Sequence, residues 1–324
     1  MRVFRSLEEV PPDFGPSALT IGNFDGVHAG HRRILRRLKE LAEKYDWKPS
    51  VLTFDPHPTR VVAPERAPEL MTSPDRRAAL MAEEGIHQVL ILPFTTEVAR
   101  LSPEDFVRQL LVERLGARAI LVGDNFRFGH RQAGNAALLE ELGRRYGFET
   151  EIVPGVRCRG CFVSSSGIRA LLRAGRVGLA DRYLERAYAL EGSVVPGRGV
   201  GSKQTVPTLN LSPEAGIIPA PGVYVTRTRD LDAGRSWNSV SNVGYRPTFG
   251  ESEQLSIETF LLEPLVGDSP TRIAVEFLWR IRDERKFPTP EALKARILRD
   301  AAAAERYFRR LKRWTAHEAG RPAA

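Results

Sequence analysis

The sequence is poor in cysteine and contains no long hydrophobic run. Its two cysteines among 324 residues, Cys158 and Cys161, form a single Cys-x-x-Cys. A structural zinc site needs four ligands, and no second cysteine or histidine cluster has suitable spacing, so we interpret both as reduced, incidental thiols. No segment approaches roughly 18 uninterrupted apolar residues, and the chain begins at Met1 without an apolar signal region. We therefore predict a soluble, cytoplasmic protein that binds no membrane.

The basic charge of the chain is not concentrated in one place. Lysine and arginine total 48 against 40 acidic residues, which gives a formal net charge of +8. An anionic partner is plausible on this balance, but the arginines are spread along the chain except in the short run 309–314. Such a run is usually a solvated helix face, so we predict that the chain binds no nucleic acid.

The first part of the chain alternates short apolar runs with helical patterns. Strands are predicted at 18–21, 50–54, 88–92, 119–122 and 150–153. Ser73-Pro74 and Ser102-Pro103 each place a capping serine and a first-turn proline where helices should begin. This alternation predicts an α/β fold with a doubly wound parallel sheet over residues 1–186, which binds its ligand beyond the carboxyl ends of the strands.

The sequence pattern changes after about Tyr188. Short β-rich runs at 190–195, 222–228, 239–243, 256–262 and 272–277 are separated by glycine and proline, which predicts a small antiparallel barrel. A final helix is expected to open at Thr289-Pro290 and to run through Leu311. We assign the barrel domain to residues 187–316 and expect a disordered tail at 317–324.

Two histidines, His28 and His31, stand at the turn between the first of these strands and a helix. A helix N-terminus offers unpaired N–H groups and partial positive charge, which favour a phosphate. Glycine removes the side chain where a ligand must approach the backbone closely. Imidazoles can follow the negative charge that develops on a phosphoryl group in the transition state. The pattern predicts a nucleotide site formed by the histidines with Gly22, Phe24, Gly26 and Gly30.

The pattern also carries a resemblance. The HxGH of His28 to His31 behind a strand resembles the nucleotidylyltransferase superfamily, and the longer run Gly-x-Phe-Asp-Gly-Val-His-x-Gly-His resembles the bacterial bifunctional riboflavin kinase/FMN adenylyltransferase family. The resemblance implies that the first domain transfers an adenylyl group from ATP to FMN. It also implies that His28 and His31 are catalytic.

Residues after the second and fourth predicted strands extend this site. Phe54-Asp55-Pro56-His57-Pro58 and Gly123-Asp124-Asn125-Phe126-Arg127-Phe128-Gly129 both match motifs of the resembled family. The match implies flavin contacts for Asp55, His57, Asn125, Phe128 and Arg131. Considered alone, the phenylalanines are more typical of core packing, and Arg131 is equally typical of a solvated surface.

The run Ser164-Ser165-Ser166-Gly167-Ile168-Arg169 opens another helix. Successive hydroxyls at a helix start, followed by an arginine, form a cradle for a phosphate group. The run resembles the family's Ser-Ser-Thr-x-Ile/Val-Arg, with serine at the threonine position. We expect the three serines to bind the nucleotide and Arg169 to neutralise the departing pyrophosphate.

The first candidate binding segment of the second domain is a glycine-rich basic loop. Gly199, Gly201 and Lys203 precede Pro207-Thr208-Leu209-Asn210, and the spacing is not that of a Walker P-loop. Hydroxyl and carboxamide oxygens are hard ligands of the type that a magnesium–nucleotide complex accepts. The segment resembles the riboflavin kinase Pro-Thr-Ala-Asn motif. The resemblance implies Mg²⁺ contacts for Thr208 and Asn210, and nucleotide contacts for these two residues together with Gly199, Gly201 and Lys203.

Glu258 lies in the predicted strand 256–262, where alternation places it on the face opposite Ile257. A carboxylate can take the proton of an alcohol that attacks the γ-phosphate of ATP. An outward-facing strand glutamate is usually only solvated, but the resemblance implies that Glu258 is the general base. Arg282 is predicted either to contact the flavin or to anchor the last helix.

These observations predict a two-domain enzyme with riboflavin, FMN and ATP as small-molecule substrates. The barrel would convert riboflavin to FMN and the first domain would convert FMN to FAD, with Mg²⁺ accompanying ATP and no tightly bound prosthetic group. One alternative keeps the adenylyltransferase beside a non-catalytic, flavin-binding barrel. Another is an RNA-binding HxGH protein related to class I aminoacyl-tRNA synthetases.

Overall fold

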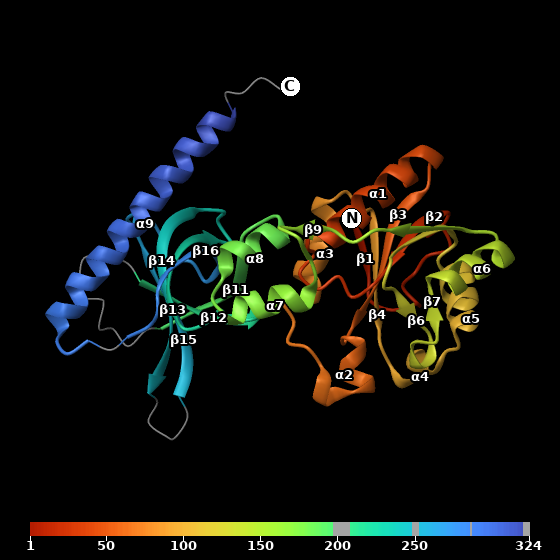
Figure 1. The fold of residues 1–324 in the computed structure, drawn as a ribbon, viewed down its shortest axis with the longest axis horizontal. Helices are drawn as coiled ribbons and strands as arrows, with labels where there is room; N and C mark the ends of the chain where they lie inside the picture. The colour runs from red at the N-terminus through yellow and green to blue at the C-terminus, as the bar shows by residue number, and fades with distance from the viewer. Residues whose placement is uncertain (197–207, 248–252, 286, 320–324) are drawn as a thin grey trace. The chain divides into compact units, whose positions relative to one another are not determined.

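The computed structural model describes residues 1–196, 208–247, 253–285 and 287–319. The chain forms two compact units, Met1–Ser165 and Ser166–Ala324 (Figure 1). The second unit begins before the predicted barrel because it includes two helices, α7 (Ser165–Arg173) and α8 (Val177–Leu184). Of these, α8 packs on two strands of the barrel.

The first unit is built on a six-stranded, fully parallel sheet. Its order is β1 (Arg2–Phe4), β4 (Gln88–Pro93), β3 (Lys48–Asp55), β2 (Ser17–Ile21), β5 (Ala117–Gly123) and β8 (Glu149–Val153). The five predicted strands are confirmed, and β1 is added at the edge. The order runs from β2 through β3 to β4 on one side and from β2 to β5 and β8 on the other. The sheet therefore reverses its winding at β2, where doubly wound folds place their ligands.

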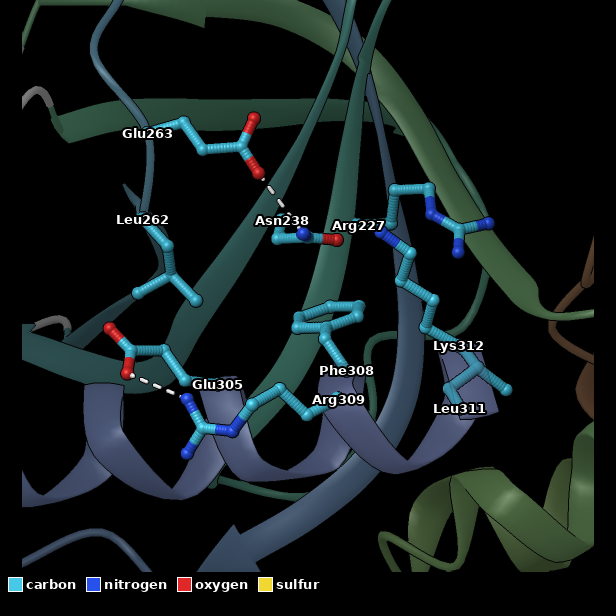
Figure 2. Close-up of a pocket in the computed structure, with 9 residues that line it drawn as sticks. All are labelled: Arg227, Asn238, Leu262, Glu263, Glu305, Phe308, Arg309, Leu311 and Lys312. Atoms are coloured by element: carbon cyan, nitrogen blue, oxygen red, sulfur yellow. Dashed lines mark hydrogen bonds and ion pairs between the residues drawn. The ribbon is translucent and has the colours of Figure 1, made fainter. Parts of the chain in front are cut away.

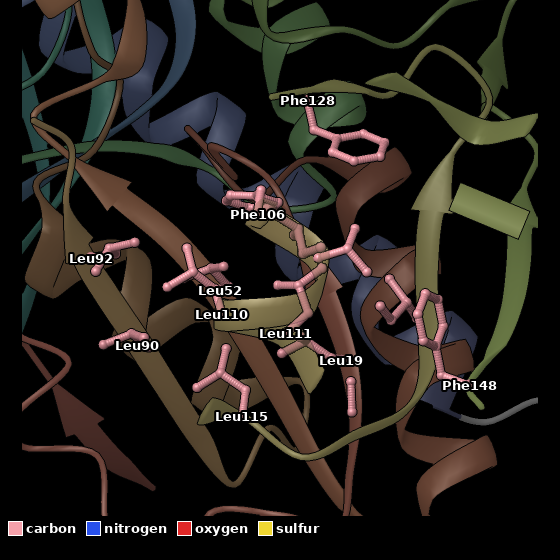
Figure 3. Close-up of a cluster of buried hydrophobic side chains, with 14 of the residues drawn as sticks. Leu19, Leu52, Leu90, Leu92, Phe106, Leu110, Leu111, Leu115, Phe128 and Phe148 are labelled. Atoms are coloured by element: carbon pink, nitrogen blue, oxygen red, sulfur yellow. The ribbon is translucent and has the colours of Figure 1, made fainter. Parts of the chain in front are cut away.

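Helices cover both faces of this sheet. Alternate strand residues form two separate cores: Leu19, Leu52 and Leu90 face one way, and their chain neighbours face the other. The leucine face packs against a π-helix (Phe106–Arg114) and α6 (Ala136–Tyr146), as Figure 3 shows in part. The opposite face packs against α1 (Ala29–Tyr45) and α3 (Pro74–Glu83).

The predicted helix starts are confirmed by their capping bonds. The Ser73 hydroxyl accepts from the backbone N–H of Arg76 at 3.1 Å, and the Ser102 hydroxyl accepts from that of Asp105 at 3.0 Å. The remaining short elements of this unit are α2 (Pro58–Val62), α4 (Thr96–Arg100), α5 (Pro103–Asp105), 3-10 turns at Pro64–Arg66 and His130–Gln132, and the two-stranded pairs β6 (Arg127–Phe128) with β7 (Gly134–Asn135) and β9 (Arg157–Cys158) with β10 (Cys161–Phe162).

The second unit contains the predicted antiparallel barrel, which is closed. Its order is β11 (Tyr188–Val195), β12 (Thr208–Ala215), β15 (Glu253–Leu261), β14 (Ser236–Pro247), β13 (Gly222–Asp230) and β16 (Arg272–Arg282). Five of these strands match the predicted ones. The sixth, β12, is the segment that the sequence marked only as a binding motif, and it closes the barrel between β11 and β15.

The barrel interior contains a chain of hydroxyls. Thr226 lies 2.9 Å from Ser239 and 2.8 Å from Ser241, and Ser241 lies 2.8 Å from Thr259, oxygen to oxygen. All four side chains are buried, so these bonds satisfy polar groups that would otherwise be costly. The neighbouring strand residues, one position along the chain, therefore face outward.

The last helix, α9 (Pro290–Ala319), packs on this outer face through Ala304 and its neighbours. The Thr289 hydroxyl caps it by accepting from the N–H of Ala292 at 3.2 Å. The helix continues to Ala319, beyond the predicted end at Leu311, and residues 320–324 of the predicted tail lie outside the described part. Within the described ranges, every helix is too short or too polar to cross a bilayer.

Candidate active sites

The loop between β2 and α1 places both predicted histidines at the carboxyl edge of the sheet. His28 is the N-cap of α1, and its Nδ1 accepts from the backbone N–H of His31 at 3.3 Å. Because Nδ1 is an acceptor in this bond, the neutral ring carries its proton on Nε2. The capping bond thus sets the tautomer that has Nε2 as its donor.

The two imidazoles are stacked. Their ring centroids lie 3.7 Å apart with an interplanar angle of 13°, and the ring of Phe24 lies 4.9 Å from that of His31. His28 is 6% exposed and Phe24 is 2% exposed. The structure therefore places Phe24 as a buried support for His31 within the predicted nucleotide loop.

Asp25 anchors this loop through hydrogen bonds of its side chain, a role that was not predicted from the sequence. Its buried carboxylate accepts from the backbone N–H of Met71 at 3.0 Å and from the N–H and hydroxyl of Thr72, each at 3.2 Å. The Thr72 hydroxyl also accepts from the N–H of Gly26 at 3.2 Å. Gly26 has φ +78°, a conformation that favours glycine.

Ser165 of the serine run contacts the histidine loop, although the two are far apart in the chain. The Ser165 hydroxyl donates to the backbone carbonyl of Asp25 at 3.2 Å. Ser164 is exposed and directly precedes α7, and Ser166 lies in its first turn. Arg169 is 8% exposed, further along the same helix. The helix begins at Ser165, so the hydroxyls lie at its N-terminus, where anions are favoured.

The end of β3 carries the first pair of predicted flavin residues. Asp55 is exposed at the last position of the strand. His57 caps α2 through Nδ1, which accepts from the N–H of Thr59 at 3.2 Å, and its Nε2 lies 3.0 Å from the side-chain amide of Asn23. Asn23 belongs to the loop after β2, so the two strand ends are joined by a side-chain contact.

The segment after β5 contains three more predicted flavin residues. Asn125 is exposed just beyond the end of β5, the strand that flanks β2 at the reversal of the sheet. Arg131 is also exposed, with φ +52°. Phe128 is 6% exposed and packs in the core with Phe106 and Phe126, at centroid distances of 6.1 and 5.4 Å. Core packing is thus its observed role.

On the barrel, three predicted residues fall in one row across five strands. Asn210 pairs with Glu258, Glu258 with Asn242, Asn242 with Val223, and Val223 with Arg282. We call this the outer row because the flanking residues Leu209, Ile257 and Ser241 are buried. Directly opposed residues have Cβ atoms only about 4.5–5.5 Å apart, so Glu258 has an asparagine as its direct neighbour on each flanking strand. Asn242 is the member that the sequence did not single out.

Thr208 lies two residues before Asn210 on β12 and is exposed on the same face. Their oxygens suit a magnesium–nucleotide complex, whereas no group of three His, Cys, Asp or Glu side chains forms a metal site in the described part of the chain. The predicted nucleotide residues Gly199, Gly201 and Lys203 lie outside the described residues.

Arg282 is bound to the last helix. Its guanidinium donates to the Asp300 carboxylate at 3.0 and 2.9 Å, and Arg296 lies 3.0 Å from the other oxygen of Asp300. Asp300 is 3% exposed. Of the two roles predicted for Arg282, the structure displays the helix anchor.

A separate cavity of about 550 Å³ lies between the barrel and α9 (Figure 2). The Asn238 amide donates to Glu263 at 3.0 Å, and Arg309 lies 3.5 Å from Glu305. The residues that line it are Arg227, Asn238, Leu262, Glu263, Glu305, Phe308, Arg309, Leu311 and Lys312. The predicted site residues are not among them.

Comparison with known proteins matches each unit to a protein family. Residues 11–167 match the FAD synthetase family and residues 184–308 match the riboflavin kinase family. Curated relatives named bifunctional riboflavin kinase/FMN adenylyltransferase include one from Pseudomonas fluorescens, 37% identical over 94% of this chain and 97% of the relative. Another is from Escherichia coli strain K12, 33% identical over 95% of this chain and 97% of the relative.

A solved structure from Streptococcus pneumoniae, described as a macrolide-efflux protein, also matches over both units. It is 25% identical, has a TM-score of 0.83, and covers 94% of this chain and 98% of its own. The likeness therefore includes the parallel sheet and the barrel together. With both halves matched and relatives similar over nearly their whole length, this chain belongs to the bifunctional riboflavin kinase/FMN adenylyltransferase family.

Proposed function

We propose that the first unit joins FMN to the adenylyl group of ATP at the edge of the sheet where β2 and β5 end. The observation that carries this assignment is the stacked His28–His31 pair at the N-terminus of α1, with Ser165 bonded to the adjoining loop. A phosphate oxygen of FMN attacks the α-phosphorus of ATP. The bond to the β-phosphate breaks, and FAD and pyrophosphate are formed without a covalent enzyme intermediate.

His28 and His31 stabilise the charge that grows on the α-phosphoryl oxygens during this step. Donors that are already oriented need no reorganisation as the charge develops, which is why such groups lower barriers effectively. Ser164, Ser165, Ser166 and Arg169 hold the departing pyrophosphate. Asp55, His57, Asn125 and Arg131 approach the flavin from the neighbouring strand ends.

We propose that the barrel phosphorylates riboflavin at the outer row. The terminal hydroxyl of riboflavin attacks the γ-phosphorus of ATP, Glu258 accepts the hydroxyl proton, and ADP leaves. Asn210 and Asn242, on the strands that flank β15, keep the carboxylate in position. FMN made here is the substrate of the first unit.

Mg²⁺ is the metal we propose for both reactions, with ATP as the substrate that brings it. Its preference for oxygen ligands fits the hydroxyl of Thr208 and the carboxamide of Asn210, next to Glu258 in the outer row. The ion would neutralise charge on the transferring phosphoryl group. No tightly bound prosthetic group is part of this proposal.

The domain boundary near residue 186 and the cytoplasm as the chain's location stay predictions. The matched families end and begin at residues 167 and 184, so α8 lies between them, although it packs on the barrel. The substrates we propose are riboflavin, FMN and ATP, with no nucleic acid or membrane partner.

One assay tests both sites. Riboflavin, ATP and Mg²⁺ are incubated with the protein, and riboflavin, FMN and FAD are separated by chromatography. The wild type should form FMN and then FAD, Glu258→Gln should stop at riboflavin, and His28→Ala should accumulate FMN. If added FMN gave FAD but riboflavin gave no FMN, the barrel would be a non-catalytic flavin-binding module. Tight, salt-sensitive tRNA binding without flavin turnover would instead favour an RNA-binding protein.

A further inference from the structure

A buried arginine connects the two halves of the adenylyl-transfer site. Arg77 lies on α3, outside the stretches of sequence in which site residues were predicted, and is 2% exposed. A buried charge is costly unless it is hydrogen-bonded and compensated. Burial lowers the pKa of the Arg77 guanidinium, and the attraction of Asp25 and Asp55 opposes that shift. The side chain therefore needs a set of fixed partners.

Those partners belong to two different strand ends. One terminal nitrogen of Arg77, Nη1, donates to the backbone carbonyl of Asn23 at 2.5 Å and to the Thr53 hydroxyl at 3.1 Å. It also lies 3.5 Å from the carbonyl of Phe54. The Thr53 hydroxyl in turn lies 3.3 Å from the Asn23 carbonyl. Arg77 thus bridges the loop after β2 to the last residues of β3.

Each bridged segment leads directly into a different part of the site. The loop at Asn23 continues to His28 and His31, on the nucleotide side. The strand end at Phe54 continues to Asp55 and His57, on the flavin side. The contact between the Asn23 side-chain amide and His57, 3.0 Å, depends on the same spacing.

We propose that Arg77 is a positioning residue of the adenylyl-transfer site. Its guanidinium sets the distance between the loop that holds ATP and the strand end that holds FMN, so that the attacking phosphate oxygen lies in line with the α-phosphorus. It touches neither substrate. This inference rests on the assignment of both substrates to this edge of the sheet.

The test compares Arg77→Met with Arg77→Lys, and Arg76→Met is the matched control. Arg76 is its chain neighbour on α3, and its guanidinium lies 3.6 Å from Glu83 on the same helix. FAD formation is measured at saturating FMN and ATP, and riboflavin phosphorylation in the same sample reports the state of the barrel.

We expect Arg77→Met to lower kcat for FAD formation by at least about tenfold, because misplacement by about 1 Å can cost as much as a hundredfold. The KM values for ATP and FMN should change by less than about threefold, since each substrate keeps its own contacts. Arg77→Lys should recover part of the loss. Arg76→Met should match the wild type, and kinase activity should be equal in all variants.

A folded Arg77→Met protein with wild-type kcat would overturn the proposal, as would a loss expressed only in KM. If Arg77→Met does not fold, Thr53→Val removes the hydroxyl between Arg77 and Asn23 without opening a cavity. A soluble Thr53→Val protein with unchanged kcat would then be the contrary result, and a fall of several-fold would support the proposal. Loss of FAD formation in Arg77→Met while His28→Ala stays active would instead refute the site assignment itself.

Discussion

The imidazole rings of His28 and His31 are stacked, with centroids 3.7 Å apart, and the His28 ring is held by the backbone N–H of His31. The two residues are thus one structural unit, in which the His28 ring caps the helix through Nδ1 and presents its candidate catalytic donor through Nε2. A change in either ring disturbs the other. The predictions for the first unit follow from this coupling.

Replacing His28 or His31 by alanine should each lower FAD formation from FMN by at least about a hundredfold, because each removes a preorganised donor. Steady-state assays with FMN and ATP measure this. His87→Ala is the control, since His87 is exposed directly before β4, at the opposite edge of the sheet. Riboflavin phosphorylation should be unaffected. Near-normal FAD formation in both histidine variants would refute the assignment.

Gly30→Ala should lower FAD formation by about tenfold without destabilising the protein. A Cβ at position 30 would lie 3.2 Å from Cε1 and 3.3 Å from Nδ1 of His28, so the His28 ring must shift. Alanine is the better helix former, by roughly 0.8–1 kcal/mol, so the melting temperature should not fall. Thermal melts and kcat are measured on the same sample. Unchanged activity would show that the ring has room to move.

Glu258→Gln should lower riboflavin phosphorylation by about a hundredfold or more, the usual contribution of a general base. Glu263→Gln is the control because Glu263 is exposed just past the end of β15 and outside the outer row. FAD formation from added FMN should be equal in both variants. If Glu258→Gln phosphorylated riboflavin at the wild-type rate, another group would have to accept the proton.

Asp300→Ala should lower the free energy of unfolding of the barrel by about 3 kcal/mol or more, since it leaves Arg282 and Arg296 without their buried partner. Glu305→Ala is the matched control on α9. Glu305 and Arg309 are more than half exposed, and such pairs contribute about 0–1 kcal/mol. Denaturant titration of both variants measures the two losses of unfolding free energy. Equal effects would mean that the Asp300 cluster does not anchor the helix.

Asp181→Asn should flatten the dependence of stability on pH. The pKa of Asp181 is raised to about 8, chiefly by burial and also by the charge of Glu276, while the hydrogen bond from the Tyr188 N–H and the charge of Arg186 oppose the shift. The folded pKa is above the unfolded value of about 3.9, so the stabilising contribution is complete below that value and is lost as pH rises through about 8. The wild type should lose melting temperature between about pH 4 and pH 8, and the variant should lose less. Parallel curves would contradict this.

Several local features could be read from the sequence because they depend on neighbours in the chain. The capping serines Ser73 and Ser102, the histidine spacing and the alternation around Glu258 are all short-range patterns, and the corresponding elements are present. The strand β12 is not marked by strict alternation, since Leu209, Asn210 and Leu211 are all buried, and its binding motif lies on the strand itself. The helix α9 continues past Leu311 because no proline or glycine follows there to stop it.

The sequence alone determined the two-part organisation, five of the six strands of the sheet and the residue types that we propose bind phosphate. Only the tertiary structure decided which of those residues meet. It bonds Ser165 to the loop of Asp25 and aligns Asn210, Glu258 and Asn242 in the outer row. It also buries Arg77 fully, whereas its chain neighbour Arg76 is only partly buried. These relations depend on strand order and register, which are set by packing over the whole unit and leave no mark in a local stretch of sequence.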